Sequence, residues 1–168
     1  MFGIFKKKPT SVIGPAESFR ACNVYCHADA DKAIVAAVFN HGGLVAEKPG
    51  GATTLAFSDL DALEEAVQAA LRACEFRLDF DYSESKKSDW PAYQASRYKT
   101  MKAFEADFVN LHVRGANASN LIYTITSPSF GEFGLELQAC ARPSLKEFAE
   151  AIHYMVKAFR ACEAAVEL

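Results

Sequence analysis

The sequence predicts an α+β fold in which helices pack on one face of a mainly antiparallel sheet. Two segments, one beginning at Ser58 and one over 144–166, carry apolar residues at helical spacing with polar residues between them. Residues 75–82 alternate strictly between apolar and polar, as in a strand with one face in the core and one in water. We therefore expect a single wet sheet face opposite two covering helices.

The first half of the chain, 18–82, follows an irregular lead-in over 1–17 that is interrupted by proline and glycine. Its expected elements are a strand over 19–27, a helix over 29–40 ended by Gly42 and Gly43, a hairpin of strands 44–47 and 52–57, a helix from Ser58 and a strand over 75–82. This β-α-β-β-α-β order is the split βαβ arrangement of ferredoxin-like folds.

A polar loop over 83–89 leads into the second half, 90–168. Its expected elements are a helix over 90–106, strands over 107–114, 120–126 and 132–140, and a helix over 144–166 that Ser144 and Glu147 begin as a capping box. This order is α-β-β-β-α. We expect the two halves to form one compact domain.

The halves share a short repeat. Arg72-Ala-Cys-Glu75 recurs as Arg160-Ala-Cys-Glu163, an offset of 88 residues. Two interpretations are open: a duplicated α+β unit, or chance similarity between two alanine-rich amphipathic helices.

Composition narrows the class of protein. Hydrophobic residues make up 51% of the 168, enough for a substantial core. The net charge of −3 argues against non-specific binding of nucleic acid, which requires a basic surface. No apolar run approaches the ~18 residues of a transmembrane helix, so we expect no membrane segment. Five cysteines, an odd number without a tight framework, favour the reducing cytoplasm.

Cys22, Cys26 and His27 form the one cluster that resembles a zinc-ligand pattern. On a strand, however, the two cysteines would face one side and the histidine the other. The sequence offers no second cysteine pair at ligand spacing and no motif around a nucleophilic cysteine. We interpret the cysteines as buried structural residues and predict no metal, no cofactor and no catalytic cysteine.

Arg77, Asp79 and Asp81 share the polar face of their predicted strand. Paired carboxylates can bind a divalent cation or exchange protons, but a neighbouring arginine lowers their pKa values instead of raising one. His112, on the polar face of a second predicted strand, is a lone general-base candidate. We weigh a metal or acid–base site against solvent-exposed strand faces and favour the exposed faces.

Polar strand faces from both halves, together with aromatic residues between 83 and 98, form a surface suited to binding another protein. The residues predicted to form this surface are Arg77, Asp79, Asp81, Trp90, Tyr93, Asn110, His112, Arg114 and Glu136.

The leading functional hypothesis is a non-catalytic cytoplasmic protein that binds another protein and occludes it, as an inhibitor or immunity protein does. The size and layout are similar to those of small bacterial proteins of these kinds, and no motif identifies a family. One alternative is a small-molecule-binding domain with a pocket between the halves, lined by Tyr82, Tyr93, Tyr98 or Tyr123. Another is an enzyme that uses Asp79, Asp81 and His112. Homodimerisation is left open.

Overall fold

The computed structural model describes residues 20–41, 44–77, 89–117, 120–126, 136–141 and 148–166. The strands of the described residues are β1 (Ala21–His27), β2 (Ala33–His41), β3 (Leu44–Leu55), β4 (Glu75–Phe76), β5 (Phe108–Asn117), β6 (Asn120–Thr126) and β7 (Glu136–Ala141). The helices are α1 (Leu60–Ala73), α2 (Pro91–Ser96), α3 (Met101–Asp107) and α4 (Phe148–Val166).

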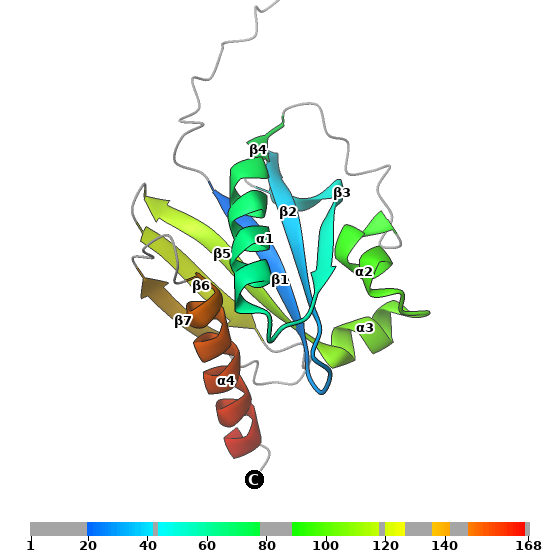
Figure 1. The fold of residues 1–168 in the computed structure, drawn as a ribbon, viewed down its shortest axis with the longest axis vertical. Coiled ribbons are helices and arrows are strands. Elements are labelled where there is room, and N and C mark those ends of the chain that lie inside the picture. Colours follow the sequence, from blue (N-terminus) through cyan, green and yellow to red (C-terminus); the bar gives the residue numbers. More distant parts are fainter. Residues whose placement is uncertain are drawn as a thin grey trace, which may run out of the picture.

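Six strands form an antiparallel sheet in the order β3-β2-β1-β5-β6-β7, and the short β4 pairs in parallel with β2 (Figure 1). The predicted α+β class with a mainly antiparallel sheet is confirmed. None of the described helices is long and apolar enough to cross a membrane.

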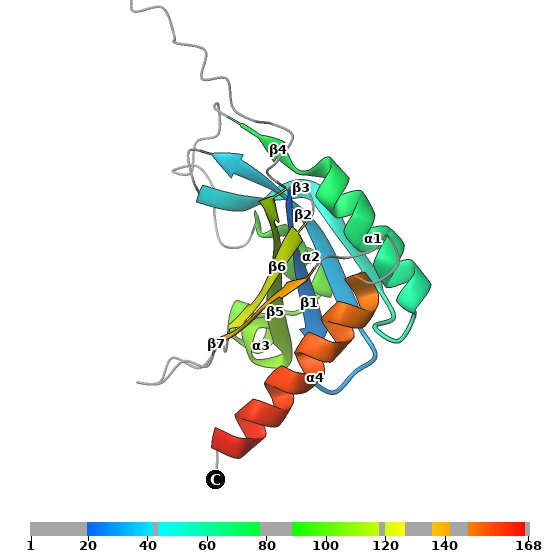
Figure 2. The same cartoon turned by 90° about the vertical axis from the view of Figure 1, so that its left-hand side faces the viewer.

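Helices α1 and α4 cover one face of the sheet, as the sequence predicts (Figures 1 and 2). The Asp59 side chain caps α1 by accepting from the Ala62 backbone N–H at 3.0 Å. The Glu64 carboxylate accepts from the Ala149 backbone N–H at 2.9 Å, which ties α1 to the first turn of α4. The largest fully buried side chains of this core are Tyr123, Phe159, Leu63, Leu111, Ile125, Ile152, Val24 and Val35.

The opposite face is also covered at one end, so the prediction that helices cover only one face is wrong there. Tyr25 and Ile34 project from the sheet into a second core with Phe104 and Phe108. The Tyr25 ring lies 5.5 Å from Phe104 and 5.6 Å from Trp90, measured between centroids. Residues 90–108 bring enough aromatic surface to cover this end of the sheet.

The predicted helix over 90–106 is two helices. Arg97 has a left-handed backbone with φ of 63°, which ends α2. Thr100 then caps α3, its hydroxyl accepting from the Ala103 backbone N–H at 3.2 Å. The turn separates two short helices, and both contribute residues to the second core.

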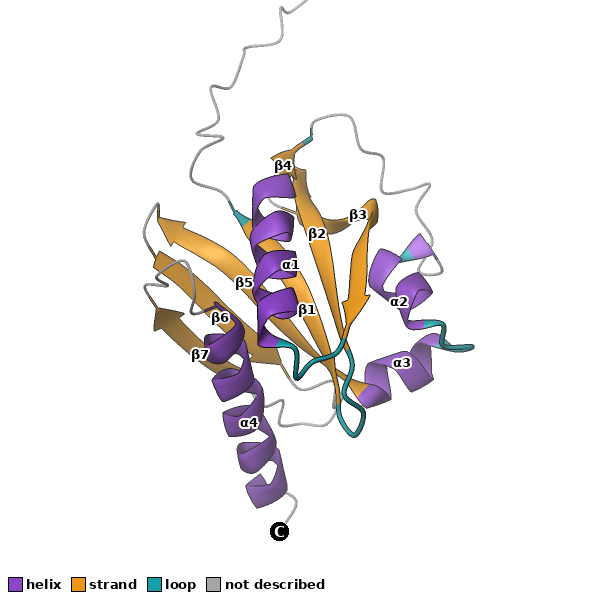
Figure 3. Ribbon diagram, viewed as in Figure 1, coloured by secondary structure: helices purple, strands orange, loops and turns teal. Residues whose placement is uncertain are grey.

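The predicted helix over 29–40 is strand β2, shown as a strand in Figure 3. Its residues 33–39 are all buried, because α1 covers one face of β2 and the second core covers the other. A strand that is buried on both faces carries apolar residues in succession, and this pattern resembles a buried helix.

The predicted hairpin of 44–47 with 52–57 is instead one long strand, β3, which pairs with β2 on both sides of a bulge. Val38 pairs with Glu47 and Ala36 pairs with Ala52, so residues 48–51 lie outside the ladder. The β-α-β-β-α-β order is therefore wrong, and the first half reads β-β-β-α-β. Of the strand predicted over 75–82, Glu75–Phe76 is found as β4, and 78–82 lie outside the described residues.

Three strands followed by a helix occur twice, as β1-β2-β3-α1 and as β5-β6-β7-α4. The two sets meet at the β1–β5 pair, where Asn23 lies opposite His112 and Tyr25 opposite Asn110. A duplicated unit would produce this layout, with the two copies related across the antiparallel β1–β5 pair. Duplication stays a prediction, and this layout supports it.

Candidate protein-binding surface

The second core ends at Phe108, and the rest of that sheet face, over β5, β6 and β7, forms what we call the open half-face. Strand registers place its side chains in rows, and most are polar. The open half-face consists of Asn110, His112, Arg114, Ile122, Thr124, Thr126, Glu136, Gln138 and Cys140, all half-buried or exposed. In Figure 2 the sheet is seen edge-on, with α1 and α4 on its other side.

Four of the residues predicted for a binding surface lie together here. They are Asn110, His112, Arg114 and Glu136. The half-face carries charges of both signs, on Arg114 and Glu136. These two residues lie in different rows, and the row of His112 runs between them. The alternation in β5 is as the sequence predicts: Asn110, His112 and Arg114 lie on this face, and the buried Val109, Leu111 and Val113 lie on the other.

The remaining predicted residues lie elsewhere or are not described. Trp90 and Tyr93 are half-buried and pack against the second core. Arg77 follows β4, where its Nε donates to Glu75 at 2.6 Å and its guanidinium lies 4.9 Å from the centroid of the Phe39 ring. Asp79 and Asp81 lie outside the described residues, so their predicted pairing with Arg77 stays a prediction.

A chain of hydrogen bonds runs from the open half-face into the second core. His112 Nδ1 lies 2.7 Å from Asn23 Oδ1, and Asn23 Nδ2 donates to Glu47 Oε1 at 3.1 Å. Tyr25 donates its hydroxyl to the same Glu47 oxygen at 2.5 Å, and the Ala92 backbone N–H donates to Oε2 at 2.8 Å. The Glu47 side chain, from β3, thereby holds the first turn of α2 on the sheet.

Sequence reasoning missed Glu47. Only 9% of its surface is exposed, although it was expected at the end of a short hairpin strand. Its burial depends on the bulge in β3, which sets Glu47 opposite Val38 and beneath Ala92. The available signal was a single acidic residue in an otherwise apolar strand segment, which is too common to identify a buried carboxylate.

Two groups of this hydrogen-bond chain, His112 and Tyr25, have shifted pKa values. Burial, followed by the charge of Arg114, lowers the pKa of His112 from its ordinary value of 6.5. Burial, the nearby Glu47 charge and the hydrogen bond to Glu47 raise the pKa of Tyr25 well above 10.0. His112 is therefore neutral and Tyr25 protonated at neutral pH.

Cys22 and Cys26 are buried, as predicted, whereas Cys140 and Cys162 are exposed, so the prediction of buried cysteines is wrong for those two. Cys22 and Cys26 are buried against α1 and α4, and burial raises the pKa of Cys26 to about 12. His27 points to the other face, where its Nδ1 accepts from the backbone N–H groups of Asp29 and Ala30. Within the described ranges, no group of three His, Cys, Asp or Glu side chains is placed to hold a metal ion.

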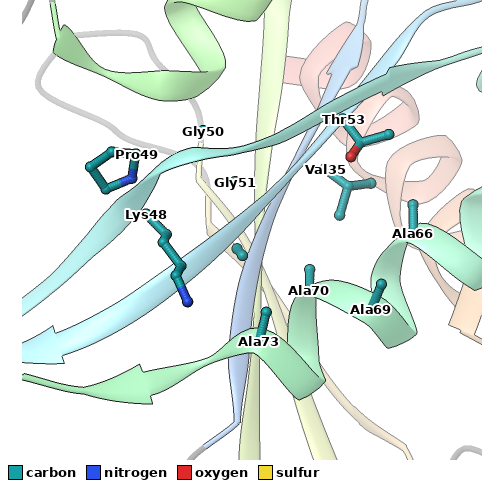
Figure 4. A pocket seen from close by; sticks show the side chains of 11 residues that line it. Val35, Lys48, Pro49, Gly50, Gly51, Thr53, Ala66, Ala69, Ala70 and Ala73 are labelled. Atoms are coloured by element: carbon teal, nitrogen blue, oxygen red, sulfur yellow. The ribbon is translucent and has the colours of Figure 1, made fainter.

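Two pockets open on the side that carries α1 and α4. One, of about 280 Å³, lies between the β3 bulge and α1 and is lined mainly by small side chains and by Lys48 at the bulge (Figure 4). The other, of about 320 Å³, lies beside α4 next to the stacked rings of Phe57 and His153, whose centroids are 3.9 Å apart. Neither is lined by the tyrosines expected for a pocket between the halves, and Tyr123 is fully buried.

No protein-family model and no curated protein matches the sequence. Among solved structures, a protein of unknown function from Neisseria meningitidis is similar, with a TM-score of 0.64 at 13% identity, over 85% of this chain and 96% of that chain. A chain from the CdiA-CT/CdiI toxin and immunity complex of Yersinia pseudotuberculosis has a TM-score of 0.59 at 17% identity, over 83% and 96% respectively. At these identities the similarity shows a shared small α+β fold.

Proposed function

We propose that this chain is a protein-binding module of the immunity type, which uses the open half-face to occlude a partner protein. The observation that carries the proposal is the half-face itself. No helix of the described part of the chain covers it, the other face of the sheet is packed, and its polar side chains are half-buried or exposed and lie in rows set by the strand pairing. Fixed polar groups with charges of both signs favour specific recognition of another protein.

The fold similarity to a chain of a toxin and immunity complex supports this proposal, because that fold occurs in an assembly of two proteins. It does not identify the surface that is used, since fold alone does not determine function. The choice of the open half-face rests on the side chains of this chain.

The size of the half-face limits its role. Three strands about 4.8 Å apart and roughly 20 Å long present about 300 Å². A stable interface buries about 800 Å² on each partner. The half-face would therefore supply the central contacts, and the surface around it would supply the rim.

Capture from a native lysate, followed by calorimetry with the purified captured protein, tests the proposal. Arg114→Glu replaces the positive charge of the half-face by a negative one, and we expect it to weaken binding at least about tenfold. The matched control is Arg72→Glu, which makes the same change at an exposed position on α1, on the far side of the sheet. Equal affinities of the two variants, or no protein retained by the wild type at physiological salt, would contradict the proposal.

A further inference from the structure

The hydrogen-bond chain behind the open half-face determines which way each of its groups points. The Glu47 carboxylate receives three donors, from Tyr25, Asn23 and the Ala92 backbone. An ionised carboxylate only accepts hydrogen bonds, so Asn23 turns its amide nitrogen toward Glu47. The amide oxygen of Asn23 then faces His112.

This orientation determines the tautomer of His112. The 2.7 Å separation between His112 Nδ1 and Asn23 Oδ1 requires one donor, and the amide oxygen can only accept. Nδ1 therefore carries the proton. In a neutral imidazole the other nitrogen has none, so His112 Nε2 is left as a hydrogen-bond acceptor.

No hydrogen bond to His112 Nε2 is formed within the described part of the chain, and the ring is half-buried on the open half-face. Its uncharged row neighbours are Asn23 and Thr124. The charged groups around it are Arg114 on the same strand, Glu136 on β7 in the adjacent row, and Glu47 on β3 behind Asn23. Arg114 is exposed and makes no ion pair with another described residue.

We propose that His112 Nε2 and Arg114 act together as a recognition pair, which binds a hydroxyl or N–H donor and a carboxylate on the protein partner. This inference rests on the proposed function and specifies the chemistry of the partner. The two side chains lie two residues apart on β5, a spacing of about 7 Å. A partner segment in extended conformation offers the same spacing between residues i and i+2, for example a serine or threonine two positions from an aspartate or glutamate.

The uncomplexed protein tests the first half of this inference without any partner. Long-range ¹H–¹⁵N NMR spectra distinguish the two imidazole tautomers, and we expect His112 to carry its proton on Nδ1 at neutral pH. Asn23→Ala removes the acceptor and should give a mixture of tautomers. A wild-type spectrum with the proton on Nε2 would overturn the inference, because that nitrogen would then be a donor.

Binding of the partner captured above tests the second half. Because the pKa of His112 is lowered, Nε2 gains a proton only as the pH falls below 6.5, and it then becomes a donor that repels the partner's donor. We expect the affinity of the wild type to fall as the pH drops from about 7 to about 5. His112→Gln keeps a neutral acceptor, so it should retain binding near pH 7 and lose this pH dependence.

His112→Leu removes the acceptor and should weaken binding about tenfold at neutral pH, because a buried donor of the partner is then left unpaired. Urea unfolding of each variant verifies that it is folded. If Arg114→Glu weakens binding while His112→Leu and pH have no effect, the inference falls and the proposed function stands. If Arg114→Glu and the Arg72→Glu control bind alike, the proposed function itself falls.

Discussion

The most direct test of the buried hydrogen bonds around Glu47 is the substitution Glu47→Gln. The wild-type carboxylate accepts hydrogen bonds from Tyr25, Asn23 and the Ala92 backbone, on both of its oxygens. Glutamine has nearly the same shape but only one acceptor oxygen. Whichever way the amide is turned, its NH₂ group faces at least one buried donor, and that donor loses its partner.

Leaving a buried donor unpaired costs about 1–3 kcal/mol, so we expect Glu47→Gln to lower the free energy of unfolding by about 2 kcal/mol. In a chain of this length each kcal/mol shifts Tm by about 2–4 °C. Equilibrium urea unfolding gives the free energy, and differential scanning calorimetry gives Tm. The control is Glu65→Gln, on an exposed glutamate of α1, which should change stability by less than about 0.5 kcal/mol.

Tyr25→Phe separates the two ends of the network, because it removes the hydroxyl donor while keeping the ring in the second core. In the double variant, Tyr25→Phe with Glu47→Gln, the Tyr25 donor is absent. The loss in free energy of unfolding should therefore be smaller than the sum of the losses of the two single variants. A Glu47→Gln variant as stable as the Glu65→Gln control would refute the idea that a buried carboxylate fastens α2 to the sheet.

Two further predictions concern the bulge and the cysteines. Gly51→Ala should destabilise the chain by about 1–3 kcal/mol in urea unfolding, because the added Cβ would lie 2.9 Å from the Lys48 carbonyl oxygen. Gly50→Ala should cost about 1 kcal/mol, because its Cβ meets open space but its φ is +70°. Equal stability of Gly51→Ala and the wild type would contradict the bulge geometry. A thiol reagent should label the exposed Cys140 and Cys162 in the native protein, and Cys22 and Cys26 only after unfolding; mass spectrometry follows the sites, and labelling of Cys22 as fast as Cys140 would show that its face of the sheet is open.

The sequence predicts best where a strand or helix has one wet side. The alternation of β5 and β6 and the apolar stripes of α1 and α4 each follow a single period, and these elements are found. The prediction is wrong for strand β2 because both of its faces are buried, which removes the alternation that distinguishes a strand from a helix. Its seven buried residues 33–39 are identifiable as core but not as strand.

The hydrogen-bond chain was beyond prediction for a different reason. It joins Asn23, Glu47, Ala92 and His112, which come from four separate segments. Their meeting depends on the register of two strand pairs and on the bulge that shifts Glu47. Alternation places His112 on a polar face, but only tertiary structure shows which atom of its ring is left free.

The two ends of the same sheet face show why one is covered and the other is open. Across β1 and β2, Tyr25 lies opposite Ile34, and the equivalent row of β5 and β6 sets His112 opposite Thr124. A helix packed on the first row gains apolar contacts, and the one polar group there, the Tyr25 hydroxyl, is satisfied by Glu47. A helix packed on the second row would bury His112 Nε2, at about 1–3 kcal/mol if that acceptor is left unpaired. A partner that brings its own donors and acceptors avoids this cost, so the side chains that keep α2 and α3 away are those that suit the half-face to a specific partner.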